Sequence, residues 1–202
     1  MFVFIRLAIS CLFFLCSFIA IKKVRKINKR KLYTFFITIA IALYFLLSFI
    51  PFENLFLTFD SPESAYRYFI PGKSDIELVV DGNNCDLVVD CKNDTNTLLI
   101  IPKTENGWKI GTGSNMVRVT QKLSDGISVN VYQYKNSNDY FITVLNVNGG
   151  KLKISDNYNT VFYSTEKSNT HLEKSYVTYY AHLADFSARY CLEVNGELIT
   201  FN

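Results

Sequence analysis

The chain has 202 residues, 49% of them hydrophobic, with 21 basic and 18 acidic side chains and a formal net charge of +3. The charge is unevenly placed. Residues 1–52 contain eight of the bases and no acid, so residues 53–202 carry 13 bases against 18 acids, a net charge of −5. No basic stripe runs through this acidic part, which argues against nucleic acid as a partner.

Two long apolar runs, residues 2–21 and 32–52, fill most of the N-terminal quarter. Each has about 20 residues, and a helix of that length spans the roughly 30 Å hydrocarbon layer of a bilayer. We therefore predict a transmembrane two-helix hairpin over residues 1–52, with the lipid bilayer as its partner. The segment between the runs, residues 22–31, holds seven bases and no acid, namely Lys22, Lys23, Arg25, Lys26, Lys29, Arg30 and Lys31.

These seven bases predict the topology, because short basic loops stay in the cytoplasm. Both termini and residues 53–202 then lie outside, and the chain is a two-span protein of the cell membrane. Arg6 leaves one alternative open, in which the first run is a removed signal peptide or lies on the membrane surface. The basic segment could also bind anionic headgroups, although a topology signal is the favoured interpretation.

A short helix is predicted next. Asp60 or Ser61 provides the N-cap, Pro62 lies just inside the helix, and Glu63 lies in the first turn, where the helix dipole favours an acid. Apolar residues at helical spacing carry the helix to about Phe69.

From residue 76 onward the pattern changes to short alternating or apolar runs separated by turn residues, about ten strands in all, among them residues 98–103, 127–134, 140–146 and 160–165. Asn195-Gly196 is a strong hairpin signal. We predict a mainly antiparallel β (α+β) extracytoplasmic domain with one short helix. A loop at residues 111–114 suggests a small curved-sheet subdomain over 53–115 and a β-sandwich-like subdomain over 116–202. Whether these share one core is left open.

The run Ser61-Pro62-Glu63-Ser64-Ala65, followed by strands that end at Gly107-Trp108-Lys109-Ile110, resembles the outward-facing modules of Gram-positive bacterial membrane-anchored proteins. Such modules begin with an S/T-P-E-x-A helix, and some have a cystatin-like or NTF2-like curved sheet. The resemblance covers residues 60–110. It implies a domain that binds or supports partners, and it carries over no functional residue.

The cysteines and histidines give no metal site. Cys85 and Cys91 lie on one predicted strand, roughly 20 Å apart, and so cannot bond to each other. Cys191 could pair with either, or all three could be free thiols. There is no CxxC motif, and His171 and His182 lie near no cysteine in the sequence. We predict no metal and no cofactor.

We also predict no catalytic residues. There is no GxSxG motif, and residues 111–115 lack the lysine of a phosphate-binding loop. His171 is interpreted as a loop residue and His182 as a strand histidine satisfied by its neighbours. The tyrosines are more suggestive, because this side chain suits amphipathic contacts as well as strand packing. Packing is the commoner role, but the candidate contact surface consists of Tyr132, Tyr134, Tyr140 and Tyr179.

Three functional hypotheses follow. The leading one is a membrane-anchored, non-enzymatic extracytoplasmic domain that binds a protein or polymer of the cell envelope. The second is a regulatory or immunity-type membrane protein that acts through its helix hairpin. The third, least favoured, is a small cell-surface hydrolase that uses carboxylates.

Overall fold

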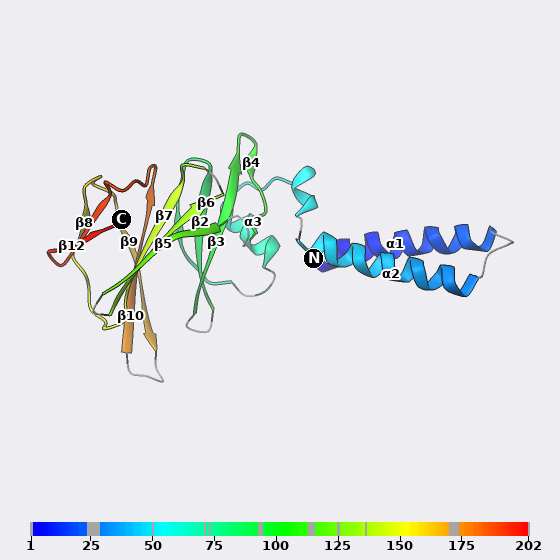
Figure 1. Cartoon of the computed structure of the whole chain (residues 1–202), viewed down its shortest axis with the longest axis horizontal. Helices are drawn as coiled ribbons and strands as arrows, with labels where there is room; N and C mark the ends of the chain where they lie inside the picture. The colour runs from blue at the N-terminus through cyan, green and yellow to red at the C-terminus, as the bar shows by residue number, and fades with distance from the viewer. Residues whose placement is uncertain are drawn as a thin grey trace. The chain divides into compact units, whose positions relative to one another are not determined.

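The computed structural model (Figure 1) divides into two compact units, Met1–Leu57 and Thr58–Asn202, which we treat separately. It describes residues 2–23, 29–49, 51–70, 72, 74–92, 95–112, 116–124, 126–135, 137–169 and 174–201.

The first unit is a helical hairpin. Helix α1 (Phe2–Lys23) and helix α2 (Lys29–Phe49) pack side by side and antiparallel, and the short 3-10 helix η1 (Phe52–Leu55) follows. Aromatic side chains join the two helices. The ring centroids of Phe13 and Phe36 are 6.3 Å apart, and those of Phe18 and Tyr33 are 5.5 Å apart. The two helices thus occupy the two apolar runs of the sequence.

The prediction that this hairpin crosses a membrane is not supported by the structure. Within the residues it describes, neither helix offers a segment that is both long and apolar enough to span a bilayer.

The second unit begins with helix α3 (Pro62–Phe69), as predicted. The Ser61 hydroxyl caps it by accepting a hydrogen bond from the backbone N–H of Ser64 at 3.2 Å. Pro62 occupies the first turn, where its missing N–H costs nothing. The buried face of the helix presents Ala65 and Tyr66 to the sheet below.

Three antiparallel sheets make up the rest of this unit, which confirms the predicted mainly antiparallel β class and includes a curled, half-barrel sheet. The first sheet has the order β1 (Ile76–Val80), β2 (Cys85–Lys92), β3 (Thr95–Thr104), β4 (Gly107–Trp108). The second has the order β5 (Met116–Ser124), β6 (Ile127–Tyr134), β7 (Tyr140–Asn146), β10 (Lys174–Leu183), β9 (Tyr163–Asn169). The third has the order β12 (Glu197–Thr200), β11 (Cys191–Val194), β8 (Ile154–Asp156).

Because successive side chains of a strand point to opposite faces, the apolar side chains of these sheets form three hydrophobic clusters. One face of the first sheet packs against α3 through Val88, Leu99 and Ile101. The other face meets the five-stranded sheet, where Leu87 and Ile100 pack in one cluster with Phe141 and Tyr180. The opposite face of the five-stranded sheet forms the third cluster, which includes residues of the three-stranded sheet. The first two sheets therefore share a core at Phe141 and Tyr180.

Because of this shared core, we expect the two sheets to unfold together. Leu87→Ala removes a fully buried side chain of the cluster and should lower the free energy of unfolding by about 2–5 kcal/mol. Trp108, the only tryptophan, reports on the first sheet by fluorescence, and near-UV circular dichroism reports on the tyrosines. Urea titration of the full chain should give coincident, equally shifted transitions by both signals.

The matched control is Leu198→Ala, since that side chain is 65% exposed, and its transition should stay at the wild-type position. A Leu87→Ala transition that shifts by Trp108 fluorescence alone would show that the two sheets unfold independently.

Candidate functional site

The structure divides the four tyrosines of the candidate contact surface between the two faces of the five-stranded sheet. Tyr132 and Tyr134 lie on the face toward the first sheet: Tyr132 lines a cavity there and Tyr134 packs on the shared core. Tyr140 and Tyr179 belong to the cluster on the opposite face. The hydroxyl of Tyr179 accepts a hydrogen bond from the backbone N–H of Leu152 at 2.7 Å. These four residues are not brought together, and their role in contacts stays a prediction.

The basic segment is only partly described. Lys22, in the last turn of α1, has its amino group 4.7 Å from the centre of the Phe18 ring, and Arg30 and Lys31 lie exposed in the first turn of α2. Lys23 and Lys29 lie at the helix ends. Arg25 and Lys26 are outside the described residues, as are His171 and residues 113–115.

All five cysteines are free thiols in the structure. Cys85 and Cys91 lie at the two ends of β2, opposite Pro102 and Asn96 of β3, as expected for residues too far apart to bond. Among the residues that the structure describes, no group of three histidine, cysteine or acidic side chains is arranged to hold a metal ion.

A cavity of about 360 Å³ lies between the first sheet and the five-stranded sheet. Its lining includes Asn130, Thr143 and Thr178 of the five-stranded sheet, together with Asn96 of β3 and Lys167 of β9. Asn130 and Tyr180 lie in register on either side of Thr143, so one row of side chains crosses three strands. The cavity therefore adjoins the shared core, where the two sheets meet.

This volume falls within the range of small-molecule sites, which are concave and place a few polar groups among apolar and aromatic walls. The lining fits that description, because it combines Leu98 and Leu145 with tyrosines, amides and one lysine. It is larger than the two hollows of about 260 Å³ described next, and we take it as the candidate binding site of the β-rich unit.

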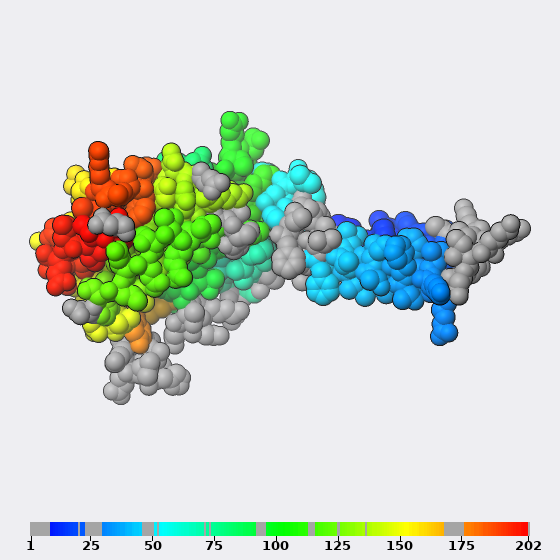
Figure 2. Space-filling model, in the orientation of Figure 1, coloured from blue at the N-terminus to red at the C-terminus, as the bar shows by residue number. Residues whose placement is uncertain are grey.

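A second feature of the surface is apolar. Figure 2 shows β5 (green) on the visible face of this unit, next to the C-terminal strands (red). Strand β5 is at an edge of its sheet, and Val117, Leu123 and Leu198 are 51%, 73% and 65% exposed. Leu123 lines two hollows of about 260 Å³ each, and Leu198 lines one of them.

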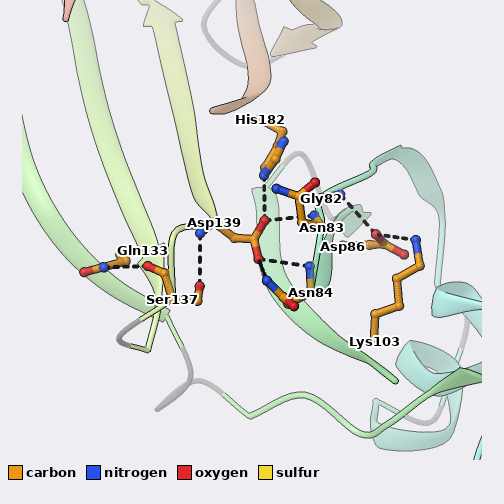
Figure 3. Close-up of polar contacts among 9 residues, drawn as sticks. All are labelled: Gly82, Asn83, Asn84, Asp86, Lys103, Gln133, Ser137, Asp139 and His182. Atoms are coloured by element: carbon orange, nitrogen blue, oxygen red, sulfur yellow. Dashed lines mark hydrogen bonds and ion pairs between the residues drawn. The ribbon is translucent and has the colours of Figure 1, made fainter. Parts of the chain in front are cut away.

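A buried carboxylate, Asp139, joins the two sheets (Figure 3). It immediately precedes β7 and accepts hydrogen bonds from the turn between β1 and β2: from the backbone N–H of Asn83 at 2.8 Å, and from the backbone and side-chain N–H groups of Asn84 at 2.9 and 2.8 Å. His182 of β10 donates a fourth through Nε2 at 2.7 Å. Burial alone would raise the pKa of Asp139, but these donors outweigh it and lower the pKa.

The neighbouring turn depends on glycine. A Cβ atom on Gly82 would lie 2.3 Å from the carbonyl oxygen of Cys85, too close for any other residue. The backbone N–H of Gly82 donates a hydrogen bond to the carboxylate of Asp86 at 3.2 Å. Asp86 also accepts a hydrogen bond from the indole N–H of Trp108, and its carboxylate lies 3.9 Å from the amino group of Lys103. Burial nevertheless raises the pKa of Asp86.

An aspartate–histidine pair also occurs in nucleophilic catalysis, where the histidine activates a serine or cysteine. In the described part of the chain, the side chain of His182 hydrogen-bonds to Asp139, as expected for a strand histidine satisfied by a neighbour. The closest nucleophile in sequence to this turn, Cys85, is fully buried, and burial strongly raises the pKa of its thiol. The pair therefore fixes the β1–β2 turn on the five-stranded sheet, a structural task.

Neither a protein-family model, nor a curated protein, nor a solved structure matches the chain. The function proposed below therefore rests on the chain's own residues.

The residues that sequence patterns miss here are Asp139, Asn96 and Lys167. Asp139 follows a polar turn and looks like a solvated turn residue. Asn96 and Lys167 occupy polar stretches that have no strand signal. Each receives its role from a strand far away in the sequence, so no local pattern could have revealed it.

Asp139→Asn tests the joining role through pH. The pKa of Asp139 is lower in the folded than in the unfolded chain, so its carboxylate stabilises the fold above the unfolded pKa near 4, and this is lost as pH falls through the folded pKa. At neutral pH the variant should lose about 2–3 kcal/mol of unfolding free energy, because charged hydrogen bonds are broken. Urea titrations should show this difference shrinking as the pH falls below 4.

Asp185→Asn is the control, because that side chain is exposed and its stability should match the wild type at every pH. A deficit of Asp139→Asn that stays constant down to the lowest pH would show that shape, and not charge, makes Asp139 important.

Proposed function

We propose that this chain is a membrane-anchored, non-enzymatic binding protein: residues 1–52 form the anchor, and the β-rich unit outside the cell binds a component of the cell envelope. The observation that carries the proposal is the 360 Å³ cavity between the first sheet and the five-stranded sheet, with its mixed polar and aromatic lining.

A binding role is favoured over catalysis by the state of the titratable groups of the β-rich unit. The Asp139–His182 pair is engaged in holding a turn, and the Cys85 thiol is buried with a raised pKa. Among the described residues, Asp86 is the one carboxylate whose pKa is raised, and its hydrogen bonds go to Gly82 and Trp108. Such groups position the backbone and leave no acid–base pair for hydrolysis.

The surface of the hairpin supports the anchor. Apolar side chains on both helices are more than half exposed, as with Leu12 at 63%, Phe35 at 58% and Phe45 at 58%. Exposed apolar surface of this extent on a soluble hairpin would be costly, whereas acyl chains would cover it. The basic segment favours the cytoplasmic side for the loop.

Thiol labelling in intact cells tests the topology. A chain whose five native cysteines are replaced serves as background, and a single cysteine is introduced at Asn28, in the basic segment, or at Asn138, which is exposed in the β6–β7 turn. A membrane-impermeant maleimide should modify position 138 and not position 28, because only the β-rich unit faces outward.

Permeabilised cells provide the control, since both positions should then react. Modification of position 28 alone in intact cells, or of neither position, would place the β-rich unit inside and contradict the proposal.

A second candidate function, regulation through the hairpin itself, is favoured by one observation. A largely apolar groove of about 560 Å³ lies between α1 and α2, lined in part by Phe14, Ile37 and Tyr44. Such a groove could receive a helix of another membrane protein, with small residues such as Ser10 and Ala40 permitting close approach.

Exchange of the anchor separates the two functions. Residues 1–57 are replaced by an unrelated two-span hairpin, and the chimera is expressed in cells that lack the native chain. We expect the chimera to restore the function that these cells lack, because the β-rich unit carries that function. A chimera that labels from outside at position 138 but restores nothing would assign the function to the hairpin.

A further inference from the structure

Two polar side chains that line the 360 Å³ cavity, Asn96 and Lys167, have buried atoms without a hydrogen-bond partner among the described residues. Asn96 donates from its side chain to the hydroxyl of Tyr180 at 2.8 Å, but its own carbonyl oxygen Oδ1 is buried and accepts from no described residue. Asn96, which lines the cavity, thus has an acceptor with no partner among the described residues.

Lys167 is the complementary group. Its side chain is only 10% exposed, and its amino group is buried with no hydrogen-bond partner among the described residues. The nearest acid is Glu77 of β1, whose Oε1 lies 3.9 Å away, beyond hydrogen-bond distance. An amino group offers three N–H donors, and buried donors are costly to leave unused.

These two groups define what a ligand must offer. An acceptor with negative charge would pair with Lys167, and a hydroxyl or N–H would donate to Asn96. The single charge of Lys167 faces Glu77, and the whole part of the chain after residue 52 is acidic, so a singly charged anion fits better than a phosphate dianion. The walls add tyrosine rings at positions 132 and 176 and further hydroxyl and amide groups at Thr143 and Asn130.

We propose that this cavity binds a sugar acid, with the carboxylate on Lys167, a ring hydroxyl donating to Asn96, and the sugar ring against Tyr132. A sugar acid is favoured over an acidic peptide because several neutral hydroxyl and amide groups line the cavity, and Lys167 is the one cation among its described lining residues. The inference rests on the proposed binding function and gives it a ligand class.

The experiment is a calorimetric titration of the full-length protein in detergent with glucuronate. Two matched probes dissect the chemistry: glucose has the ring hydroxyls without the carboxylate, and cyclohexanecarboxylate has the carboxylate without the hydroxyls. Glucuronate should bind at least about tenfold more tightly than either, since each probe leaves one buried group unpaired.

Lys167→Met keeps the length of the side chain and removes its charge, and it should weaken glucuronate binding about tenfold or more. Lys167→Arg should retain most of the affinity. Lys151→Met is the matched control, because Lys151 is exposed and lies outside the cavity, and it should bind as the wild type does. Urea titration by Trp108 fluorescence shows whether each variant is folded.

Several results would overturn the inference. The wild type could show no glucuronate binding, or it could bind glucose as tightly as glucuronate. Folded Lys167→Met could bind glucuronate as tightly as the wild type does. Tighter binding of N-acetylglutamate amide than of glucuronate would make the ligand an acidic peptide. The comparison of probes on the wild type decides the matter even if Lys167→Met does not fold. The proposed function is judged separately by the labelling result, so an outward-facing unit that ignores glucuronate rejects the ligand class alone.

Discussion

The β-rich unit depends on one buried carboxylate. Asp139 receives four hydrogen bonds, three from the β1–β2 turn and one from β10, so a single side chain ties a turn of the first sheet to two strands of the second. A buried charge is stable only when its oxygens are saturated with donors. Since the donors come from distant parts of the chain, the charge is satisfied only when both sheets are in place.

The position of this junction explains why a cavity lies beside it. Next to Asp139, the rings of Phe141 and His182 meet at a tilt with centroids 5.3 Å apart, and Phe141 and Tyr180 belong to the shared core. Farther along the same face, Thr143 and Thr178 replace large apolar residues, so the interior is no longer filled. Close packing at one end of the face and small polar residues at the other leave a permanent hollow.

The sequence patterns predict some of this structure well. Strands β6 and β7 were predicted with the bounds they have, because clear alternation is closed by polar turns. Helix α3 was predicted from Pro62, Glu63 and a cap at Asp60 or Ser61, and the structure shows that the cap is Ser61. The patterns fail where polar residues form strands. Strand β3 begins at Thr95, before its predicted start, and strand β9 extends to Asn169, past its predicted end. There, pairing with a neighbouring strand outweighs weak local preference.

These failures coincide with the candidate site. Asn96 lies in the part of β3 that looks like a turn, and Lys167 lies in the part of β9 that looks like a solvated loop. Natural sequences tend to break local rules where function requires polar groups in unusual places. Lys167 lies opposite Tyr176 in the pairing of β9 with β10, and its side chain is 10% exposed. Its amino group nevertheless makes no hydrogen bond to the described residues. The ion pair with Glu77 at 3.9 Å leaves the N–H donors of this amino group unused, and an apolar side chain of the same length would fill the space without a buried charge. An anionic ligand would account for it.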